Sequence, residues 1–398
     1  MRGRKRRTRI ICFLLAGLLG LTSCGSPSSA SLREETSVEE ALGREISSLK
    51  EEGKKGLIYE GSMELSYAEN FSVDYYQEGI RGLTTMDGTK LLVIPEGVET
   101  PEEVSEDWIV IKQPVKNLYL VSSAVMDMFQ SLNSLSAIGF SAQKAEGWYV
   151  ASAREAMEEG NILYAGKYNK PDYELIVSKG CSLAIENRMI THSPEVKEML
   201  ESFGIPVMIE YSSAEAHPLG RVEWIKFFGA LLGKEEEAKK AFAVQEEILK
   251  NVEAKEKTDL TVGFFYVTAN GMVQVRQSND YIPKLITLAG GRYIFDDLDE
   301  GDGRSTLSMQ VEEFYLGAKD ADFLIYNSSI DGGVDSLEGL IDKCEILKDC
   351  KAVQEGKVFC TTNDLYQQSM SIGYLLQDIH TMLQGGEESS MKYLFQLQ

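Results

Sequence analysis

The stretch from Ala216 to Lys257, near the middle of the chain, most constrains how this sequence can fold. A first helix is predicted from Pro218, where a missing N–H costs nothing, to Gly233, which is typical of a helix end. Its apolar residues recur every three or four positions, which predicts one buried face made of Val222, Ile225, Phe228 and Leu232.

A second helix is predicted from Lys234, because three carboxylates follow at its positive N-terminal end. Its predicted buried stripe consists of Ala238, Ala241, Phe242, Gln245, Ile248, Leu249 and Val252. About 22 residues at roughly 1.5 Å each give a rod of about 33 Å, long enough to cross between two domains. The segments before and after this rod both show α/β patterns, which favours a connecting helix over residues 234–256.

The length and charge of the chain narrow the protein class. With 398 residues, the chain suits two domains better than a single core. Residues 1–23 carry six basic and no acidic side chains, so their removal takes the formal charge from −22 to −28. Such an acidic surface argues against nucleic acid as a partner and against adhesion to anionic lipid by charge.

The N-terminus has the pattern of a targeting signal. Six basic side chains lie between residues 2 and 9, and residues 10–21 are apolar but too few for a permanent membrane span. The sequence Leu21-Thr22-Ser23-Cys24-Gly25 resembles a bacterial lipobox, which implies acylation of Cys24. We therefore expect a signal peptide over 1–23, a lipid anchor, leash and short helix over 24–56, and an extracytoplasmic, membrane-anchored protein.

Residues 57–233 are expected to form an N-terminal α/β lobe. Asp87-Gly88 between two strand-like runs predicts a hairpin, and strands are predicted over 118–121, 183–185 and 207–211. Ser122 or Ser123 is the expected cap of the helix that follows the first of these strands, and Pro194 opens another helix that ends at Gly204. Strand, helix and strand with short joints predict a parallel βαβ unit, whose ligands bind beyond the carboxyl ends of the strands.

Residues 257–398 are expected to form a C-terminal α/β lobe with the same plan. Strands are predicted over 261–267, 272–276, 323–326 and 358–360, and helices over 310–318 and 371–383. Asn270-Gly271 is the expected turn between the first two strands. Asn279 or Asp280 is expected to cap a short helix that ends at Gly290.

Two α/β lobes, a helical connector and a lipid anchor together resemble the substrate-binding proteins of ABC importers, in the iron-complex and vitamin B12 class. The resemblance covers roughly Val115 to the C-terminus. It implies two Rossmann-like lobes joined by a single long helix, the class III periplasmic-binding-protein fold. It also implies a monomer without enzymatic activity, whose partners are an ABC permease and its ATPase.

In this family each lobe carries a surface glutamate that docks on an arginine of the permease, shortly before a Pro-Asp-aliphatic strand. Glu174 stands at the expected distance before residues 182–185, and Glu313 is the nearest match in the second lobe, with Glu312 as its alternative. The proline of that pattern is absent from both lobes.

The residues expected to bind a ligand are arginines and aromatic side chains of the two lobes and of the connector's start, which suit a large chelate with anionic groups. They are Trp148, Tyr164, Tyr168, Arg188, His217, Arg221, Tyr266, Arg276, Tyr281, Arg304 and Tyr366. A bare transition metal needs three or four converging ligands, and the three histidines are too few to bridge two lobes. We therefore predict no intrinsic cofactor and no metal site built by the protein alone.

The expected ligand is an iron complex, a ferric siderophore, with a corrinoid or heme as the alternative. Phosphate-cradling loops, nucleophile elbows and zinc-protease motifs do not occur in the sequence. An extracellular lipid-anchored enzyme and a sensory or structural lipoprotein remain rival interpretations. Of the cysteines after Cys24, Cys344 and Cys350 are the closest pair that could oxidise, with small buried thiols as the other reading.

Overall fold

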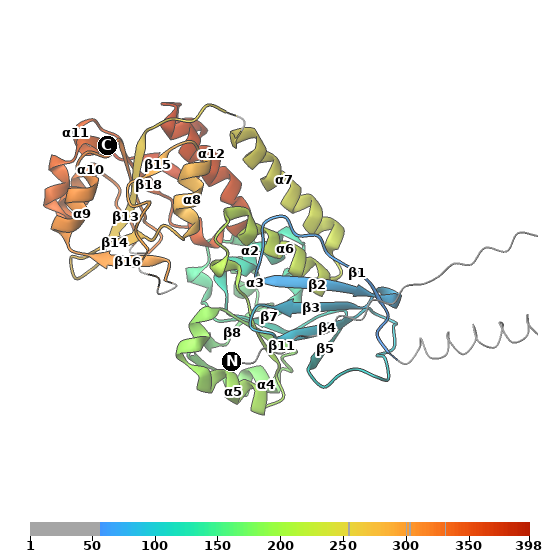
Figure 1. The fold of residues 1–398 in the computed structure, drawn as a ribbon. Helices are drawn as coiled ribbons and strands as arrows, with labels where there is room; N and C mark the ends of the chain where they lie inside the picture. Colours follow the sequence, from blue (N-terminus) through green and yellow to red (C-terminus); the bar gives the residue numbers. More distant parts are fainter. Residues whose placement is uncertain (1–55, 254, 300, 302–303, 331) are drawn as a thin grey trace, which may run out of the picture. The chain divides into compact units, whose positions relative to one another are not determined.

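The computed structural model describes residues 56–253, 255–299, 301, 304–330 and 332–398 (Figure 1). The predicted signal peptide, Cys24, the leash and the short helix after it lie outside the described residues. Among the helices that the structure describes, none is both long and apolar enough to cross a membrane.

The described chain begins with a five-stranded sheet of its own. Its strands lie in chain order: β1 (Tyr59–Ser62), β2 (Phe71–Tyr76), β3 (Arg81–Thr85), β4 (Lys90–Ile94) and β5 (Trp108–Lys112). The predicted Asp87-Gly88 hairpin is confirmed between β3 and β4, where Gly88 has φ 86° and donates to Thr85. The sequence did not predict that these strands form a separate sheet.

The next sheet belongs to the first lobe, named here lobe 1. All its strands are parallel, in the order β12 (Val207–Ile209), β11 (Leu183–Glu186), β6 (Leu118–Leu120), β7 (Ile138–Ser141) and β8 (Leu163–Tyr164). Its helices are α2 (Ser123–Ser131), α3 (Ala151–Glu158), α4 (Tyr173–Ser178) and α5 (Pro194–Ser202), and β9 (Gly166–Lys167) and β10 (Lys170–Pro171) form a small hairpin. The parallel β11–α5–β12 unit is confirmed.

One local prediction in lobe 1 was wrong. Ser122 is the residue before α2, but its side chain makes no capping hydrogen bond. Its hydroxyl instead donates to the buried carboxylate of Glu210 at 2.7 Å, because that carboxylate at the end of β12 needs a partner away from water.

The connector is a pair of helices, α6 (Pro218–Leu232) and α7 (Glu235–Glu253). They are separated, as predicted, by Gly233, whose φ of 70° is left-handed. At 19 residues α7 is shorter than the predicted rod. The prediction that α6 buries a single face was wrong, because twelve of its fifteen residues are buried.

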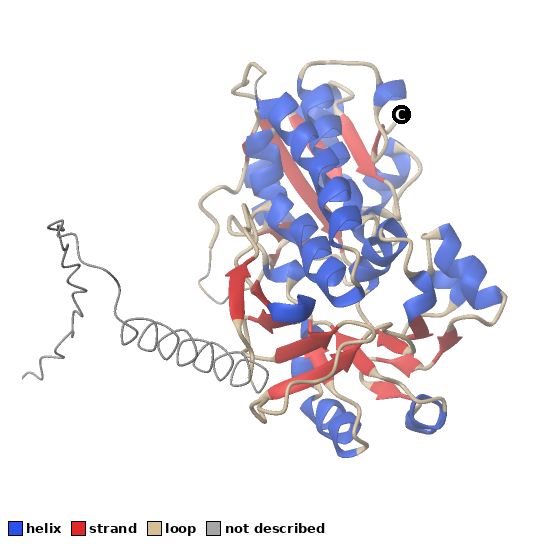
Figure 2. Ribbon diagram, turned by 90° about the vertical axis from the view of Figure 1, so that its right-hand side faces the viewer, coloured by secondary structure: helices blue, strands red, loops and turns tan. Residues whose placement is uncertain are grey.

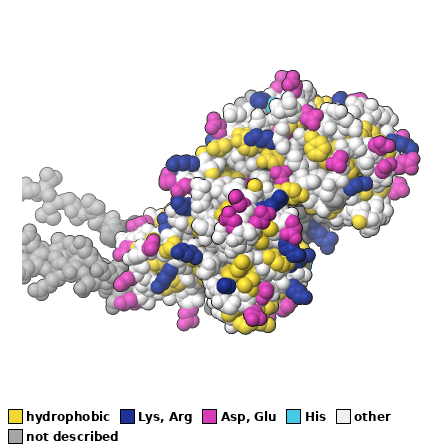
Figure 3. Space-filling model, turned by 180° about the vertical axis from the view of Figure 1, so that it is seen from behind, with side chains coloured by type: hydrophobic (Ala, Val, Ile, Leu, Met, Phe, Trp, Pro, Cys, Tyr) yellow, Lys and Arg dark blue, Asp and Glu magenta, His cyan; other side chains and the backbone are white. Residues whose placement is uncertain are grey.

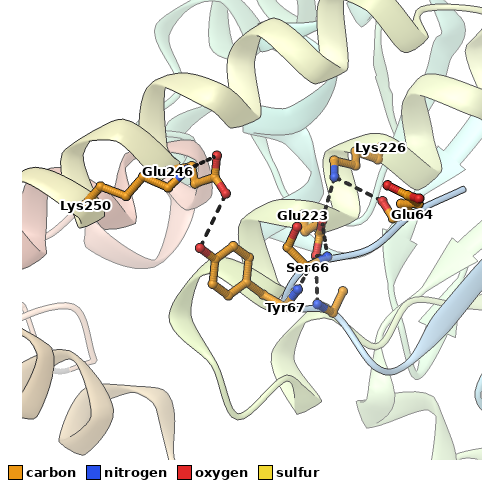
Figure 4. A network of polar contacts seen from close by, with 8 residues as sticks. Glu64, Ser66, Tyr67, Glu223, Lys226, Glu246 and Lys250 are labelled. Carbon is orange, nitrogen blue, oxygen red and sulfur yellow. Dashed lines mark hydrogen bonds and ion pairs between the residues drawn. The ribbon is translucent and has the colours of Figure 1, made fainter. Parts of the chain in front are cut away.

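The burial of α6 follows from its neighbours. The N-terminal sheet packs on one side through Phe71, whose ring lies 4.9 Å from that of Trp224, and α7 packs along another. Glu223 of α6 is fully buried, and its carboxylate accepts the backbone N–H groups of residues 66–68 and the ammonium of Lys226 at 2.6 Å (Figure 4). These contacts attach the N-terminal sheet to the connector.

The second lobe, named lobe 2, contains a mixed sheet. The strand order is β16 (Thr306–Met309), β14 (Val273–Arg276), β13 (Thr261–Val267), β17 (Phe323–Tyr326), β18 (Val358–Thr361) and β19 (Leu394–Gln396), with β15 (Arg292–Tyr293) beside the start of β13. Its helices are α8 (Tyr281–Leu288), α9 (Val311–Ala318), α10 (Leu337–Lys343), α11 (Lys351–Gln354) and α12 (Ile372–Leu383). Figure 2 shows helices lying over one face of these strands.

The predicted elements of lobe 2 are found at their expected places, and Asp280 caps α8 by accepting the N–H of Ile282. The plan differs from that of lobe 1 in its edges, since β14, β16 and β19 pair antiparallel with their neighbours. The predicted class, two α/β lobes joined through a long helix, is confirmed. The residue boundaries of the lobes stay predictions.

Candidate functional site

Four predicted ligand-binding residues from distant parts of the chain come together where the two lobes meet. Arg221 is in the first turn of α6, Arg276 ends β14, Tyr281 begins α8, and Tyr366 lies in the loop after β18. The carboxyl ends of β13, β17 and β18 point toward this loop, because the three strands are parallel. This is the edge at which open α/β sheets bind ligands.

Arg276 is held in place by a polar network. Its guanidinium donates to the hydroxyl of Tyr366 and lies 3.6 Å from the carboxylate of Asp280. The same Tyr366 hydroxyl also accepts from the side-chain amide of Asn327 at 2.8 Å. Burial alone would lower the pKa of Arg276, but the neighbouring Tyr366 and Asp280 more than offset this and raise it. The guanidinium is therefore a fixed, permanently charged group.

Arg221 approaches the same place from the connector. Its guanidinium lies 4.1 Å from the centre of the Tyr281 ring, and it also donates to the backbone oxygen of Ser213 at 3.0 Å. Burial raises the pKa of Tyr281, so its phenol stays neutral and its ring keeps the electron-rich face that a cation prefers. The contact joins the connector to the first turn of α8.

A small cavity of about 30 Å³ lies beside these residues and has walls from both lobes. It is lined by Ala124, Met128, Ser212, Arg221, Tyr281, Leu365, Tyr366, Gln368, Ser369, Ile372 and Leu375. Its volume matches the share of one water molecule in the liquid, so no chelate fits inside it as it stands. We regard this cavity as the floor of an interlobe site.

The lobe 1 residues predicted for the site are more scattered. Trp148 is buried in the core, and its indole N–H donates to Ser141 at 3.2 Å. Tyr164 is exposed and lies 5.8 Å from the ammonium of Lys144, measured to the ring centre. Tyr168 is half-buried in the β9–β10 turn, and Arg188 is exposed just after β11.

The contacts given for Arg221, Arg276, Tyr281 and Tyr366 do not include Tyr266 or Arg304 of lobe 2. The hydroxyl of Tyr266 donates to Gln274 on the adjacent strand at 2.6 Å. Arg304 is exposed just before β16.

His217 has a structural task in the fold. Its Nδ1 accepts the backbone N–H of Leu219 at 3.1 Å and so caps α6, and its ring stacks on Tyr67 at 4.6 Å. Burial lowers the pKa of His217, which favours the neutral ring that this cap requires. In the part of the chain that the structure describes, no group of three or more His, Cys, Asp or Glu residues could hold a metal ion.

Among the described cysteines, Cys181 and the predicted pair Cys344 and Cys350 are free thiols. Cys344, Cys350 and Cys360 are buried. Burial raises the pKa of Cys350 to about 11, so this thiol is unreactive at neutral pH.

Sequence reasoning missed the contacts that hold the two lobes together. The side-chain amide of Gln367 in lobe 2 bonds to the backbone of Gly147 and Tyr149 in lobe 1, each at 2.8 Å. Beside it, Asp127 of α2 accepts the backbone N–H of Met370 at 2.8 Å. The only sequence signal for these contacts is a polar loop after a predicted strand, and that signal does not predict which residues of the other lobe the loop contacts.

Sequence reasoning also gave no role to Glu186 at the carboxyl end of β11. Its side chain is fully buried, and neither carboxyl oxygen has a hydrogen-bond partner among the described residues. Burial raises the pKa of Glu186 to about 8. The group is therefore neutral at pH 7 and differs from the other buried carboxylates described above, each of which is paired.

Both predicted docking glutamates lie on the surface. Glu174 is exposed in the first turn of α4, and Glu313 is exposed in the first turn of α9, next to the equally exposed Glu312.

Comparison with known proteins supports the fold. No family model matches the chain. Two uncharacterized lipoproteins of Methanocaldococcus jannaschii are each 26% identical to it, one over 350 residues (80% of this chain and 81% of the relative) and one over 347 residues (83% and 86%).

The solved structures that align with this chain include periplasmic binding proteins and a transport protein. A periplasmic binding protein of Veillonella parvula aligns with a TM-score of 0.57, over 69% of this chain and 93% of its own. The periplasmic heme-binding protein HutB of Vibrio cholerae aligns with a TM-score of 0.55, over 67% and 98%. An Fe3+-hydroxamate transport protein of Saccharomonospora viridis aligns with a TM-score of 0.51, over 68% and 93%. Each is 16% identical to this chain, so the likeness establishes the two-lobed binding-protein fold.

Proposed function

We propose that this protein is the extracytoplasmic substrate-binding component of an ABC importer. It captures an iron chelate, a ferric siderophore, between its two lobes and delivers it unchanged to a membrane permease. The observation that carries the proposal is the meeting of Arg221, Arg276, Tyr281 and Tyr366 at the carboxyl ends of the lobe 2 strands. The fold, shared with binding proteins for heme and for Fe3+-hydroxamate, supports it.

The chemistry of this cluster suits a bulky ligand with anionic oxygens. A guanidinium binds carboxylate or catecholate oxygens through two parallel N–H groups, and a phenol ring offers an apolar face to an organic ligand. Because Arg276 is already oriented by Tyr366 and Asp280, little side-chain entropy is lost when it binds such a ligand. The protein itself carries no intrinsic cofactor in this proposal.

Capture requires that the lobes part, since the cavity at their junction holds about 30 Å³. Parting breaks the contacts of Gln367 with Gly147 and of Met370 with Asp127, and leaves α7 as the link between the lobes. A continuous helix bends little, so we expect a small opening rather than a wide swing.

The proposed location follows from the N-terminal sequence. Acylation of Cys24 would tether the protein to the outer leaflet, and the Ser-rich segment after it would act as a leash. The exposed Glu174 and Glu313 would then meet the permease at the membrane surface.

The direct test is equilibrium binding to the purified protein. A ferric tricatecholate, a ferric trihydroxamate, heme and cobalamin are titrated separately while tryptophan fluorescence and ligand absorbance are recorded. The proposal predicts saturable one-to-one binding of a ferric chelate, which is recovered unaltered. Failure of every ligand to bind would overturn it, and chemical turnover of one of them would instead indicate a lipid-anchored enzyme.

Heme is the second candidate ligand, favoured by the structural likeness to heme-binding proteins. The same titration separates the two, because heme binding to a tyrosine or histidine shifts its main absorbance band while a ferric siderophore has a charge-transfer band instead. A corrinoid remains the third candidate and has its own visible spectrum.

A further inference from the structure

Arg221 of the candidate site is held at both ends by a segment that the N-terminal sheet contacts. Its guanidinium donates to the backbone oxygen of Ser213, which lies between β12 and α6. Its backbone N–H donates at 3.3 Å to the backbone oxygen of His217, the residue that caps α6. We call residues 211–217 the β12–α6 loop. The position of the Arg221 guanidinium depends on where this loop lies.

One part of the β12–α6 loop forms a wall of the candidate site. Ser212 lines the interlobe cavity, and its backbone N–H donates to the buried carboxylate of Glu210 at 2.8 Å. The loop directly follows β12, so it lies at the carboxyl edge of the parallel lobe 1 sheet, where α/β sheets bind ligands. A shift of the loop would therefore move both the cavity wall and the Arg221 guanidinium.

Other residues of the loop are held by the N-terminal sheet. Glu215 is buried, and its carboxylate accepts the backbone N–H groups of Glu69 and Asn70, each at 3.0 Å. Both of these residues belong to the loop between β1 and β2, and Tyr67 of the same loop stacks on the ring of His217 at 4.6 Å. Two residues of the β12–α6 loop are thus fixed by a segment that precedes lobe 1 in the chain.

The β3–β4 hairpin reaches the β12–α6 loop as well. The backbone N–H of Met86 at the hairpin tip donates to the backbone oxygen of Asn70 at 2.9 Å. Burial alone would raise the pKa of Asp87, but hydrogen bonds within the hairpin hold it below its ordinary value, so the group is a carboxylate. Burial raises the pKa of Tyr211 to about 12, and the charge of Asp87 and a hydrogen bond to it add to the rise. The Tyr211 phenol therefore lies beside the hairpin tip.

An acidic chain that binds an anionic chelate needs accurately placed arginines. The formal charge of the chain is −22, and Figure 3 shows basic side chains scattered among carboxylates on one face of the protein. Because the basic groups on that face are not gathered into one positive field, recognition depends on directed hydrogen bonds from individual guanidinium groups. A guanidinium that is already oriented also loses less side-chain entropy when the ligand binds.

We propose that the N-terminal sheet is a functional part of the ligand site: through Asp87 and Tyr67 it positions the β12–α6 loop and so orients Arg221 toward an anionic chelate. This inference rests on the proposed function. It gives a binding role to strands that precede Val115, where the resemblance to two-lobed binding proteins begins. Asp87 and Tyr67 are positioning residues, because they act on the ligand through Arg221.

A double-mutant cycle separates positioning from a merely structural role. Asp87→Ala and Tyr67→Leu are each made in the full wild-type chain and in Arg221→Ala, and the Kd for a ferric tricatecholate is measured. We expect each substitution to raise the Kd of the wild type about 3- to 10-fold, mainly through faster dissociation, and to leave the Kd of Arg221→Ala unchanged. Asp87→Asn and Tyr67→Phe should recover most of the affinity, because the amide oxygen still accepts hydrogen bonds and the phenyl ring still stacks on His217.

The matched controls are Asp74→Ala and Tyr59→Leu. Asp74 accepts from Ser62 and Tyr59 packs edge-on against Tyr76, and both contacts lie within the N-terminal sheet. The controls should leave Kd unchanged in both backgrounds. Equal effects of the test substitutions in the wild type and in Arg221→Ala would overturn the inference, as would a loss of thermal stability without any change in Kd.

Tyr211→Phe replaces Asp87→Ala if the latter does not fold. It removes only the phenol hydroxyl that hydrogen-bonds to Asp87, and it should show the same dependence on Arg221. A wild-type affinity of Tyr211→Phe together with a wild-type affinity of Tyr67→Leu would overturn the inference and leave the proposed function standing.

Hydrogen exchange of the unliganded full chain distinguishes this inference from the proposed function. Asp87→Ala and Tyr67→Leu should reduce the protection of the backbone N–H groups of residues 212–215 and of Arg221, whereas the two controls should not. A wild type that binds no ferric chelate would overturn the proposed function. Reduced protection in that case would still support positioning of the loop by the sheet, and unchanged protection would overturn it.

Discussion

Glu223 in α6 holds the N-terminal sheet through the backbone of Ala68, whose nitrogen lies 2.8 Å from the Glu223 Oε2 although the two residues are 155 positions apart. The same carboxylate also accepts from Ser66 and Tyr67, so one buried side chain satisfies three backbone N–H groups of the β1–β2 loop. The carboxylate of Glu215 likewise accepts the backbone N–H groups of Glu69 and Asn70. These two carboxylates thus fix the β1–β2 loop and so attach the N-terminal sheet to the connector.

Replacement of Glu223 by Gln should strongly destabilise the protein. The amide has a single acceptor oxygen and no charge, so it loses bonds to the loop and leaves the ammonium of Lys226 without its carboxylate partner. We expect the free energy of unfolding to fall by about 3 kcal/mol, as for other broken buried ion pairs. Denaturant titration measures this loss.

The matched control is Glu246→Gln. Glu246 pairs with the exposed Lys250 at 2.9 Å and is close to the hydroxyl of Tyr67 in the same network (Figure 4). Since exposed pairs contribute little, the change should stay within about 0.5 kcal/mol. Equal effects of the two substitutions would contradict the account of Glu223 as the buried anchor.

Gly229 allows α6 and α7 to pack closely, and its replacement by Ala should be destabilising. A Cβ at this position would lie 2.6 Å from the Cβ of Ala238 and 3.1 Å from the backbone oxygen of Lys234. Helix propensity alone would favour Ala by about 1 kcal/mol, but we expect a net loss of about 2 kcal/mol from overpacking. Thermal unfolding measures the sign.

Gly339 in α10 provides the comparison, because a Cβ there meets only the Ser336 hydroxyl, at an ordinary 3.4 Å. Gly339→Ala should therefore be neutral or slightly stabilising. A stabilising Gly229→Ala would show that the connector helices pack less tightly than described.

Features set by local chemistry were predictable from sequence. The break at Gly233 and the hairpin at Gly88 require left-handed backbone, which glycine supplies, and the cap at Asp280 requires only a carboxylate before a helix. The all-round burial of α6 was not predictable, since it depends on a sheet that the chain forms about 150 residues earlier. The wrong cap at Ser122 has the same cause, because Glu210 competes for that hydroxyl from a distant strand.

The candidate site was predictable as a set of residue types but not as a geometry. Arg221 was expected at the start of the connector, and Arg276, Tyr281 and Tyr366 were expected in or near cleft-facing loops of the second lobe. The fold brings the four together. Trp148 was expected in the first lobe as part of the same site, yet its side chain is buried in the core. Sequence places a residue near a strand end, whereas tertiary packing decides whether its side chain is buried or faces the cleft.

Glu186 should make stability fall as pH rises. The folded state holds its proton up to a pKa of about 8, while an unfolded glutamate loses it near its ordinary pKa of 4.5. Between these values the folded state binds more protons, so the free energy of unfolding declines with pH, by a few kcal/mol at most, and levels off above about pH 8. Glu186→Gln should remove this decline and be the more stable form at pH 9. An unchanged pH profile would contradict a buried, neutral Glu186.

Asp127 should link lobe separation to pH. Burial raises its pKa to about 6, with Asp364 adding to the rise and the N–H of Met370 opposing it. Lobe separation would expose Asp127 to water and return its pKa toward 3.8, so closure is favoured below about pH 6 and weakened above it. Hydrogen exchange at the Met370 amide, corrected for the intrinsic pH dependence, should show less protection at pH 7 than at pH 5.

Asp127→Asn should abolish this difference in protection, because the amide oxygen still accepts the Met370 N–H without titrating. Asp378→Asn is the control, since Asp378 is also buried with a raised pKa but accepts N–H groups of Lys392 and Tyr393 in its own lobe. If both variants lose the pH dependence, the effect belongs to general stability and not to the lobe contact.

Arg221 should contribute to ligand affinity through both its charge and its plane. Arg221→Ala should weaken binding of a ferric tricatecholate by roughly 10- to 100-fold, which corresponds to about 1.5–3 kcal/mol for a charged hydrogen bond. Arg221→Lys should recover only part of this, because an ammonium cannot stack flat on Tyr281 at 4.1 Å and bind two oxygens at once. Arg292→Ala is the control, since Arg292 is exposed beside the amino end of β13, away from the cluster. Equal affinities of the wild type and Arg221→Ala would remove this arginine from the site, and equal losses for Arg221→Ala and Arg292→Ala would indicate a response to net charge alone.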